Sequence, residues 1–240
     1  MSMQSSGSGA YETRLARPAD THQLSLTLAR AFHYDPVQCW LFPDESARAR
    51  KCQRLFAVFL RSLIPRETVF TTTGLEGTAL WVAPEHVKPS LLKQVELGMQ
   101  ILPILGSSIP RGIQWWLALG RRQPQYPHWY LFALGTAPEH QRKGIGSALL
   151  RPILQKCDIE RVAAYLEAGS EENVSFYQGR GFEILGEIEL PRGPTIYQLV
   201  REPVGRCMGG DCDEREYSEK PLYAYSPYTA DCSRTSHCSR

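Results

Sequence analysis

The feature that most constrains this chain is an apolar run that leads through a glycine-containing loop directly into a helix. Residues 129–134 are aromatic and aliphatic and predict a buried β-strand. The loop 141–146 follows, and the apolar spacing of residues 145–156 predicts a helix despite Pro152. A helix start presents backbone N–H groups without partners inside the helix, and the helix dipole adds positive potential there. We therefore expect an anion-binding site at this point, with a diphosphate as its natural ligand.

Two glycines and two basic residues favour this interpretation. Gly144 and Gly146 have no Cβ, so a phosphate group can approach the main chain closely. Arg142 and Lys143 add positive charge at the same rim. The dinucleotide-binding fingerprint does not fit, because Leu149 stands where it needs a third glycine, and a P-loop does not fit, because no lysine follows the second glycine. A glycine-containing helix start that binds nothing stays open as the alternative.

Composition and charge indicate an ordinary globular chain. The 240 residues are 42% apolar and 22% charged, which suits one large domain or at most two small ones. The formal net charge is +2, so overall charge indicates neither a nucleic-acid nor an acidic-membrane partner. No apolar run is long enough to span a membrane, no secretory signal is visible, and the seven cysteines are scattered. We expect a cytoplasmic protein whose oligomeric state the sequence does not give.

Periodicity divides the chain into three parts. Residues 1–10 predict a flexible leader rich in Ser and Gly, and residues 11–203 predict one mixed α/β domain around one sheet. Its expected strands lie at 13–17, 69–73, 78–82, 129–134, 162–168, 183–190 and 195–200. Its expected helices lie at 24–32, 44–63, 145–156 and 173–180, with two more inside 91–119. Asp20 and Gln23 have the spacing of a capping box for the first helix.

Residues 204–240 differ in amino-acid composition from the rest of the chain, and this composition predicts a disordered tail. Few aliphatic residues occur there, whereas it holds four of the seven cysteines, Cys207, Cys212, Cys232 and Cys238. A metal site that includes His237 is the competing interpretation. The spacings C-x4-C and C-x5-C differ from the compact pairs of common zinc modules. We therefore predict no metal site in this chain.

The glycine loop and two later stretches resemble a known superfamily. Gln141-x-x-Gly144-x-Gly146 after a strand resembles the acyl-CoA pyrophosphate loop of the GNAT superfamily of N-acetyltransferases. Residues 165–170 resemble the fifth strand of that fold, and residues 173–182 resemble its signature helix. Over residues 11–202 the pattern of residues resembles that of the puromycin N-acetyltransferases. The resemblance implies a GNAT-type fold, with a mostly antiparallel sheet of about seven strands, flanked by helices and splayed between strands 4 and 5.

The resemblance also implies acetyl-CoA as co-substrate and a primary amine as acceptor, with no metal. It places the pyrophosphate on the loop and helix start at Arg142, Lys143, Gly144, Ile145, Gly146 and Ser147. The pantetheine arm would hydrogen-bond Asn173 and lie along the backbone of Leu134, Gly135 and Thr136, in the manner of an added strand. A backbone N–H at Leu134 or Gly135 would polarise the thioester carbonyl, and a glycine inside a strand often marks a bulge or a close approach.

Two catalytic roles follow from the same resemblance. Tyr177 corresponds to the motif tyrosine that acts as general acid toward the CoA sulfur, although a tyrosine here also suits packing under Phe182. Glu167 lies on the strand that splays away and is the candidate general base, acting through water. His128 and water alone are its rivals. The sequence leaves the identity of the base open.

The acceptor pocket is predicted from the variable part of the chain. Its aromatic residues suggest a small amphipathic or aromatic amine, with Asp35 and Glu45 available to steer one ammonium group. The candidate aromatic residues are Tyr34, Trp40, Trp81, Trp115, Trp116, Tyr126 and Trp129. Two other functions stay open: an acetyltransferase acting on protein lysines or N-termini, and a non-catalytic module that binds acyl-CoA.

Overall fold

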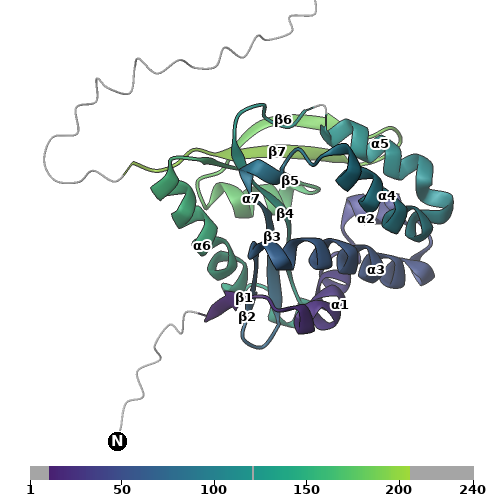
Figure 1. Ribbon diagram of the computed structural model, residues 1–240, viewed down its shortest axis with the longest axis horizontal. Coiled ribbons are helices and arrows are strands. Elements are labelled where there is room, and N and C mark those ends of the chain that lie inside the picture. The colour runs from purple at the N-terminus through teal and green to yellow at the C-terminus, as the bar shows by residue number, and fades with distance from the viewer. Residues whose placement is uncertain (1–10, 121, 206–240) are drawn as a thin grey trace, which may run out of the picture. The chain divides into compact units, whose positions relative to one another are not determined.

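A seven-stranded sheet organises the computed structural model, which describes residues 11–120 and 122–205 (Figure 1). The strand order is β1-β2-β3-β4-β5-β7-β6, and each neighbouring pair is antiparallel except β4 and β5. The strands are β1 (Thr13–Leu15), β2 (Val69–Thr72), β3 (Gly77–Val82), β4 (His128–Thr136), β5 (Ala163–Ala168), β6 (Glu183–Glu189) and β7 (Thr195–Arg201). The predicted seven-stranded, mostly antiparallel sheet is confirmed. The predicted leader and the tail cysteines lie outside the described residues.

Helices cover both faces of this sheet. They are α1 (Thr21–Ala31), α2 (Pro36–Leu41), α3 (Glu45–Leu63), α4 (Leu91–Leu105), α5 (Ile109–Gly120), α6 (Ile145–Glu160) and α7 (Glu171–Gln178). One core lies between the sheet and α1, α3 and α4, and a second lies between the sheet and α6 and α7. In Figure 1, α6 accordingly lies on one side of the strands and α1 and α3 lie on the other.

The parallel pair β4 and β5 separates part of the way along. The two strands pair from His128 and Ala163 only as far as Leu131 and Leu166, although β4 continues to Thr136. On its other side β4 stays paired with β3 along that whole remaining stretch. Among the described residues, the edge of β4 that faces β5 therefore has no neighbouring strand beyond Leu131, so the predicted splay between strands 4 and 5 is confirmed.

A β-bulge coincides with this separation. Leu80 of β3 pairs with Ala133 and Trp81 pairs with Leu131, so Phe132 is an extra residue in β4. Leu131 consequently faces the core under α6, whereas Ala133 faces the core under α1 and α3. The bulge changes which side chains of β4 face each side, at the point where the strand loses its parallel partner.

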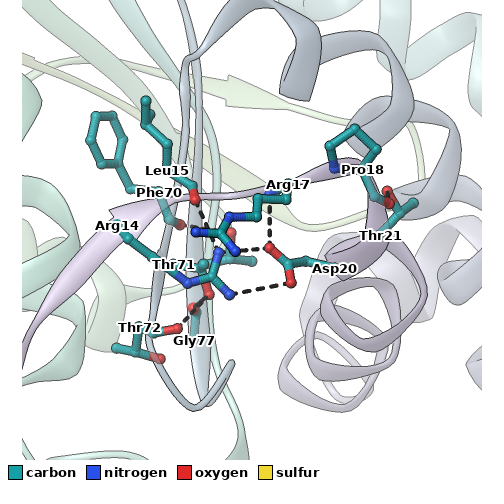
Figure 2. Close-up of polar contacts among 11 residues, drawn as sticks. Arg14, Leu15, Arg17, Pro18, Asp20, Thr21, Phe70, Thr71, Thr72 and Gly77 are labelled. Carbon is teal, nitrogen blue, oxygen red and sulfur yellow. Dashed lines mark hydrogen bonds and ion pairs between the residues drawn. The ribbon is translucent and has the colours of Figure 1, made fainter.

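The junction between β1 and α1 is held by an ion pair and not by the predicted capping box (Figure 2). The Asp20 side chain makes no capping hydrogen bond to α1, so that prediction was wrong. Its Oδ2 instead accepts from the backbone N–H of Arg17 at 2.7 Å. The Arg14 guanidinium donates to both carboxylate oxygens, at 2.7 and 3.2 Å. The carboxylate is used to fix the angle between strand and helix, and this leaves the helix start without a side-chain cap.

Gly135 allows α1 to pack closely on β4. A Cβ at this position would lie 2.7 Å from Leu28 Cδ2 and 3.2 Å from Ala31 Cβ, both on α1. The sequence suggested a bulge or a close approach here, and the close approach is that of a helix. The bulge lies three residues earlier.

We therefore expect Gly135→Ala to lower the free energy of unfolding by about 1–3 kcal/mol, through overpacking. Gly98→Ala is the matched control, because a Cβ at Gly98 in α4 would meet nothing within 4 Å. That change should raise stability by about 0.5–1 kcal/mol, since alanine loses less backbone entropy in a helix. Chemical denaturation of both variants measures the two effects, and equal stabilities would contradict the packing argument.

Candidate active site

A pocket of about 820 Å³ opens where β4 and β5 separate. Its walls come from the C-terminal halves of both strands, the loop before α6, the helix α7, the segment around α2 and the helix α5. The pocket brings together eleven of the residues predicted from the sequence, namely Leu134, Gly135, Thr136, Arg142, Gly144, Ile145, Gly146, Ser147, Glu167, Asn173 and Tyr177. Lys143 is exposed and does not line it.

The two glycines of the loop serve different purposes. Gly144 is the N-cap of α6 with φ of 85°, a left-handed conformation that favours glycine, and a Cβ there would meet nothing within 4 Å. The space in front of this helix start is therefore free for a ligand. Gly146 is needed for packing, because its Cβ would lie 3.0 Å from Phe176 Cζ on α7. Gln141 braces the loop by donating to the carbonyl of Thr136 at 3.2 Å.

Arg180 also lies at this end of the pocket, and the sequence analysis missed it. Its guanidinium stacks on the Phe176 ring at 3.5 Å from the centroid and donates to Ser147 Oγ through Nε at 3.2 Å. Ser147 lies in the first turn of α6, so Arg180 adds positive charge beside the free N–H groups. Arg180 follows the end of α7 at Gln178, so no helical spacing marked it in the sequence.

The helix α7 presents Asn173 and Tyr177 on one face, at i and i+4. The helix starts two residues earlier than predicted, because Ser170 is its N-cap and accepts from the backbone N–H of Asn173 at 3.3 Å. The Asn173 side chain is thus not the cap. Tyr177 is 9% exposed and packs edge-on against Phe182, with ring centroids 5.7 Å apart.

The Tyr177 hydroxyl keeps its proton at neutral pH. Burial raises its pKa well above the ordinary value, the Arg180 charge opposes this shift, and the Asp35 carboxylate adds to it. Such a hydroxyl can donate a proton to a strongly basic neighbouring group.

Glu167 combines a buried carboxyl group with access to the pocket. Burial raises its pKa to about 7, and hydrogen bonding from Tyr130, Tyr165 and Gln123 limits the rise. Part of the side chain is exposed to the pocket, whereas Oε1 is buried without a partner in ordinary hydrogen-bond geometry among the described residues. A carboxyl group of this kind can accept a proton near neutral pH.

His128, the rival base, does not line the pocket. Its Nδ1 lies 2.8 Å from the Tyr126 carbonyl oxygen, and its ring lies edge-on to Tyr165 at 5.3 Å between centroids. Burial lowers its pKa. The histidine sits at the start of β4, below the point where the strands separate.

The part of the pocket that we expect to receive the acceptor, here called the acceptor end, is apolar. Few of the predicted aromatic residues form it. Only Tyr34 and Trp115 of that set line the pocket. Trp81 and Trp129 are instead fully or almost fully buried in the core beneath α6. The apolar lining comes from residues whose role only the fold reveals, among them Phe32, Phe56, Leu119, Phe132 and Ile196.

Comparisons with known proteins agree with this architecture. Residues 114–182 match the sequence model of the Acetyltransferase (GNAT) family. An uncharacterized N-acetyltransferase of Schizosaccharomyces pombe is 24% identical, over 86% of this chain and 87% of its own. A solved structure from Corynebacterium glutamicum, described as histone acetyltransferase HPA2 and related acetyltransferase, is 24% identical, with a TM-score of 0.63 over 83% of this chain and 99% of its own. Arylalkylamine N-acetyltransferase 2 from Aedes aegypti is 9% identical, with a TM-score of 0.57 over 81% of this chain and 99% of its own.

The mixed sheet with its parallel β4–β5 pair is the GNAT fold. The match of residues 114–182 to the GNAT family model and the similarity to an N-acetyltransferase identify the chain as an acetyltransferase. Enzymes of this family use acetyl-CoA as co-substrate. Among the described residues, no helix is long and apolar enough to cross a membrane, and no group of three or more His, Cys, Asp or Glu side chains could hold a metal ion.

The environment of Glu167 predicts a pH-dependent stability. Its folded pKa of about 7 exceeds the ordinary 4.5, so between these values the folded chain holds a proton that the unfolded chain loses. Stability therefore falls as the pH rises through this window. Glu167→Gln removes the effect, and its free energy of unfolding relative to the wild type should increase by on the order of 2 kcal/mol between about pH 5 and pH 8.

Urea denaturation at the two pH values checks this expectation. Glu183→Gln is the control, because Glu183 is exposed on β6. A stability difference between Glu167→Gln and the wild type that does not change with pH would show that the carboxyl group ionises normally in the folded chain.

Proposed function

We propose that this chain transfers an acetyl group from acetyl-CoA directly to the primary amine of a small amphipathic or aromatic molecule. One observation carries the proposal. A single pocket joins a helix start suited to phosphates, a strand edge without a neighbour, and an apolar end that holds a carboxyl group with a pKa of about 7. These are the three parts that a direct transfer from a CoA thioester to an amine requires.

Acetyl-CoA would lie along the separated strands. Its pyrophosphate occupies the start of α6 at Gly144–Ser147 in this proposal, with Arg142, Lys143 and Arg180 supplying positive charge. The pantetheine arm follows the free edge of β4 at residues 134–136 and takes the place of the missing strand. Asn173 on α7 holds the arm from the opposite side. A backbone N–H of β4 at Leu134 or Gly135 polarises the thioester carbonyl.

The transfer then needs three proton movements. The acceptor ammonium gives a proton to Glu167, directly or through water, and the free amine attacks the thioester carbonyl carbon. The new C–N bond forms, and the C–S bond breaks as the CoA sulfur takes a proton from Tyr177. The second proton of the acceptor nitrogen, lost as the amide forms, restores the Tyr177 hydroxyl through water. The raised pKa of Glu167 supports its role, because its carboxylate accepts a proton near neutrality. The role of Tyr177 is supported by its place in the pocket beside Asn173 and not by its pKa.

The enclosing helices favour a small acceptor over a protein. Trp115 and Leu119 place α5 over the acceptor end, where a protein substrate would need an open groove. Solved neighbours include an arylalkylamine N-acetyltransferase. Puromycin is included as a test compound because of the resemblance to puromycin N-acetyltransferases proposed from the sequence, and 2-phenylethylamine tests the arylalkylamine class.

The test follows release of the CoA thiol from acetyl-CoA with a panel of acceptors. The panel contains puromycin, 2-phenylethylamine, L-phenylalanine and a lysine-containing peptide. We expect release that depends on a small amine, and we expect Tyr177→Phe to lower kcat about 10²-fold or more through loss of the general acid. Tyr197→Phe is the matched control, because this tyrosine lies on β7 outside the pocket.

Three results would contradict the proposal. Release with the peptide alone would indicate a protein acetyltransferase. CoA binding without release from any acceptor would indicate a non-catalytic acyl-CoA-binding module. Failure to bind CoA at all would remove the assigned role of residues 141–147.

The rate should depend on the ionisation of Glu167. Because the deprotonated form accepts the proton, kcat/KM for the amine should rise with pH through an apparent pKa of about 7. In Glu167→Gln the maximal rate should fall about 10²-fold and this pH step should disappear. A pH–rate profile of the two proteins measures both effects. An unchanged step in the variant would assign the base to another group.

A further inference from the structure

A second carboxyl group, that of Asp35, lines the same pocket, and the mechanism above does not use it. Asp35 is the N-cap of α2, and its Oδ1 accepts from the backbone N–H groups of Val37 at 3.0 Å and Gln38 at 3.1 Å. Its Oδ2 has no hydrogen bond or ion pair within residues 11–120 and 122–205. One oxygen therefore holds the helix, and the other is free for a ligand.

Asp44 shows that capping alone does not require a buried position. It caps α3 in the same way, accepting from the backbone N–H groups of Ser46 and Ala47, but it is exposed and outside the pocket. Its pKa is lowered, chiefly by the hydrogen bond from Ser46. At Asp35 burial reverses the direction and raises the pKa, in spite of two N–H donors. A largely buried carboxylate without a cationic partner is costly, and such groups are normally paired.

The position of Asp35 brings this free oxygen to the reaction centre. A Cβ at Gly169 would lie 3.2 Å from Asp35 Oδ2, so the carboxylate lies against the backbone just after β5. Glu167 is two residues before Gly169, so the Cα atoms of Glu167 and Gly169 lie within about 7 Å of each other. Asp35 also lies close enough to Tyr177 to raise the pKa of its hydroxyl. The missing side chain of Gly169 makes room for the carboxylate.

The charges of the pocket are divided between its two ends. The basic side chains that line it are His140, Arg142 and Arg180, and all three belong to the phosphate end or to the end of α7. Glu172 also lines the phosphate end, where it pairs with Arg142 at 3.6 Å. The other end combines apolar walls with Asp35 and Glu167. An acceptor bound there meets negative charge and apolar surface, and no basic group that would neutralise a carboxylate of its own.

We propose that Asp35 Oδ2 binds the ammonium group of the acceptor before its proton passes to Glu167, and so selects apolar amines that carry no carboxylate beside the amine. The inference rests on the proposed function and deepens it. Amines of this class are protonated at neutral pH, since their pKa values are about 9–10. Asp35 receives the charged form, and Glu167 takes the proton that must leave before attack.

Asp35→Asn tests this role, because asparagine caps a helix as well as aspartate does and only the charge is lost. With saturating acetyl-CoA, we expect the KM for 2-phenylethylamine to rise about tenfold or more. The KM for acetyl-CoA should not change, and inhibition by the uncharged analogue 2-phenylethanol should also stay the same. Asp44→Asn should leave all three values unchanged. For the wild type, we expect kcat/KM for L-phenylalanine to be at least about tenfold below that for 2-phenylethylamine.

The outcomes separate this inference from the proposed function. Wild-type turnover of amines with an unchanged KM in Asp35→Asn would overturn the inference and leave the acetyltransferase intact, with Asp35 acting as a cap alone. A fall in kcat with loss of the pH step and an unchanged KM would also overturn it, because Asp35 would then be the base. No turnover of any amine by the wild type would overturn the proposed function, and this inference with it.

Discussion

The site depends on the point where β4 and β5 stop pairing. Up to Leu131 the two strands form an ordinary parallel pair, and beyond it β4 keeps only its antiparallel neighbour β3. Backbone N–H and C=O groups seek partners, so an edge opened inside a sheet is prepared to receive another extended chain. The bulge at Phe132 lies at the same point and redirects the following side chains. One local irregularity therefore creates both the space for a ligand and the backbone groups that would hold it.

The parallel direction of this pair decides where the remaining groups of the site lie. Both strands run toward the same edge of the sheet, so the segments that follow them meet there. The loop after β4 leads into α6, and the turn after β5 leads into α7. Two helix starts, with Gly144 and Ser170 as their caps, consequently lie at the open end of the pocket. Arg180 connects the two helices through Ser147, which fixes the phosphate end as one unit.

The sequence predicted this half of the site because its signals are local. Strand, glycine loop and helix follow one another between residues 129 and 160, and α7 carries its motif within a few turns. The positions of these residues are set by neighbours in the chain, so local spacing together with the family resemblance was enough to group them, and their roles stay a proposal. The exception at this end is Arg180, whose contact with Ser147 joins two separate helices and has no local pattern.

The acceptor half could not be predicted in the same way. Trp81 and Trp129 are of a residue type that is common in ligand pockets. The alternation of side chains along their strands, however, turns both rings into the core beneath α6. Asp35 was one of several acidic candidates in the sequence, and only tertiary packing brings it against Gly169. Glu45, the other candidate, is exposed and does not line the pocket. These assignments depend on contacts between segments that are far apart in the sequence. The local periodicity of apolar residues carries no information about such contacts.

One unpaired buried polar atom lies at the site. Five buried side-chain polar atoms lack a partner within the described residues, and Glu167 Oε1 is the one among them that lines the pocket. An unpaired carboxyl group lowers stability when it ionises, so a fold selected for stability alone would replace it. Asp35 in the same pocket has one oxygen that accepts hydrogen bonds and one without a partner among the described residues. These two carboxyl groups in one pocket are the basis for our proposal that a protonated amine supplies the missing partner.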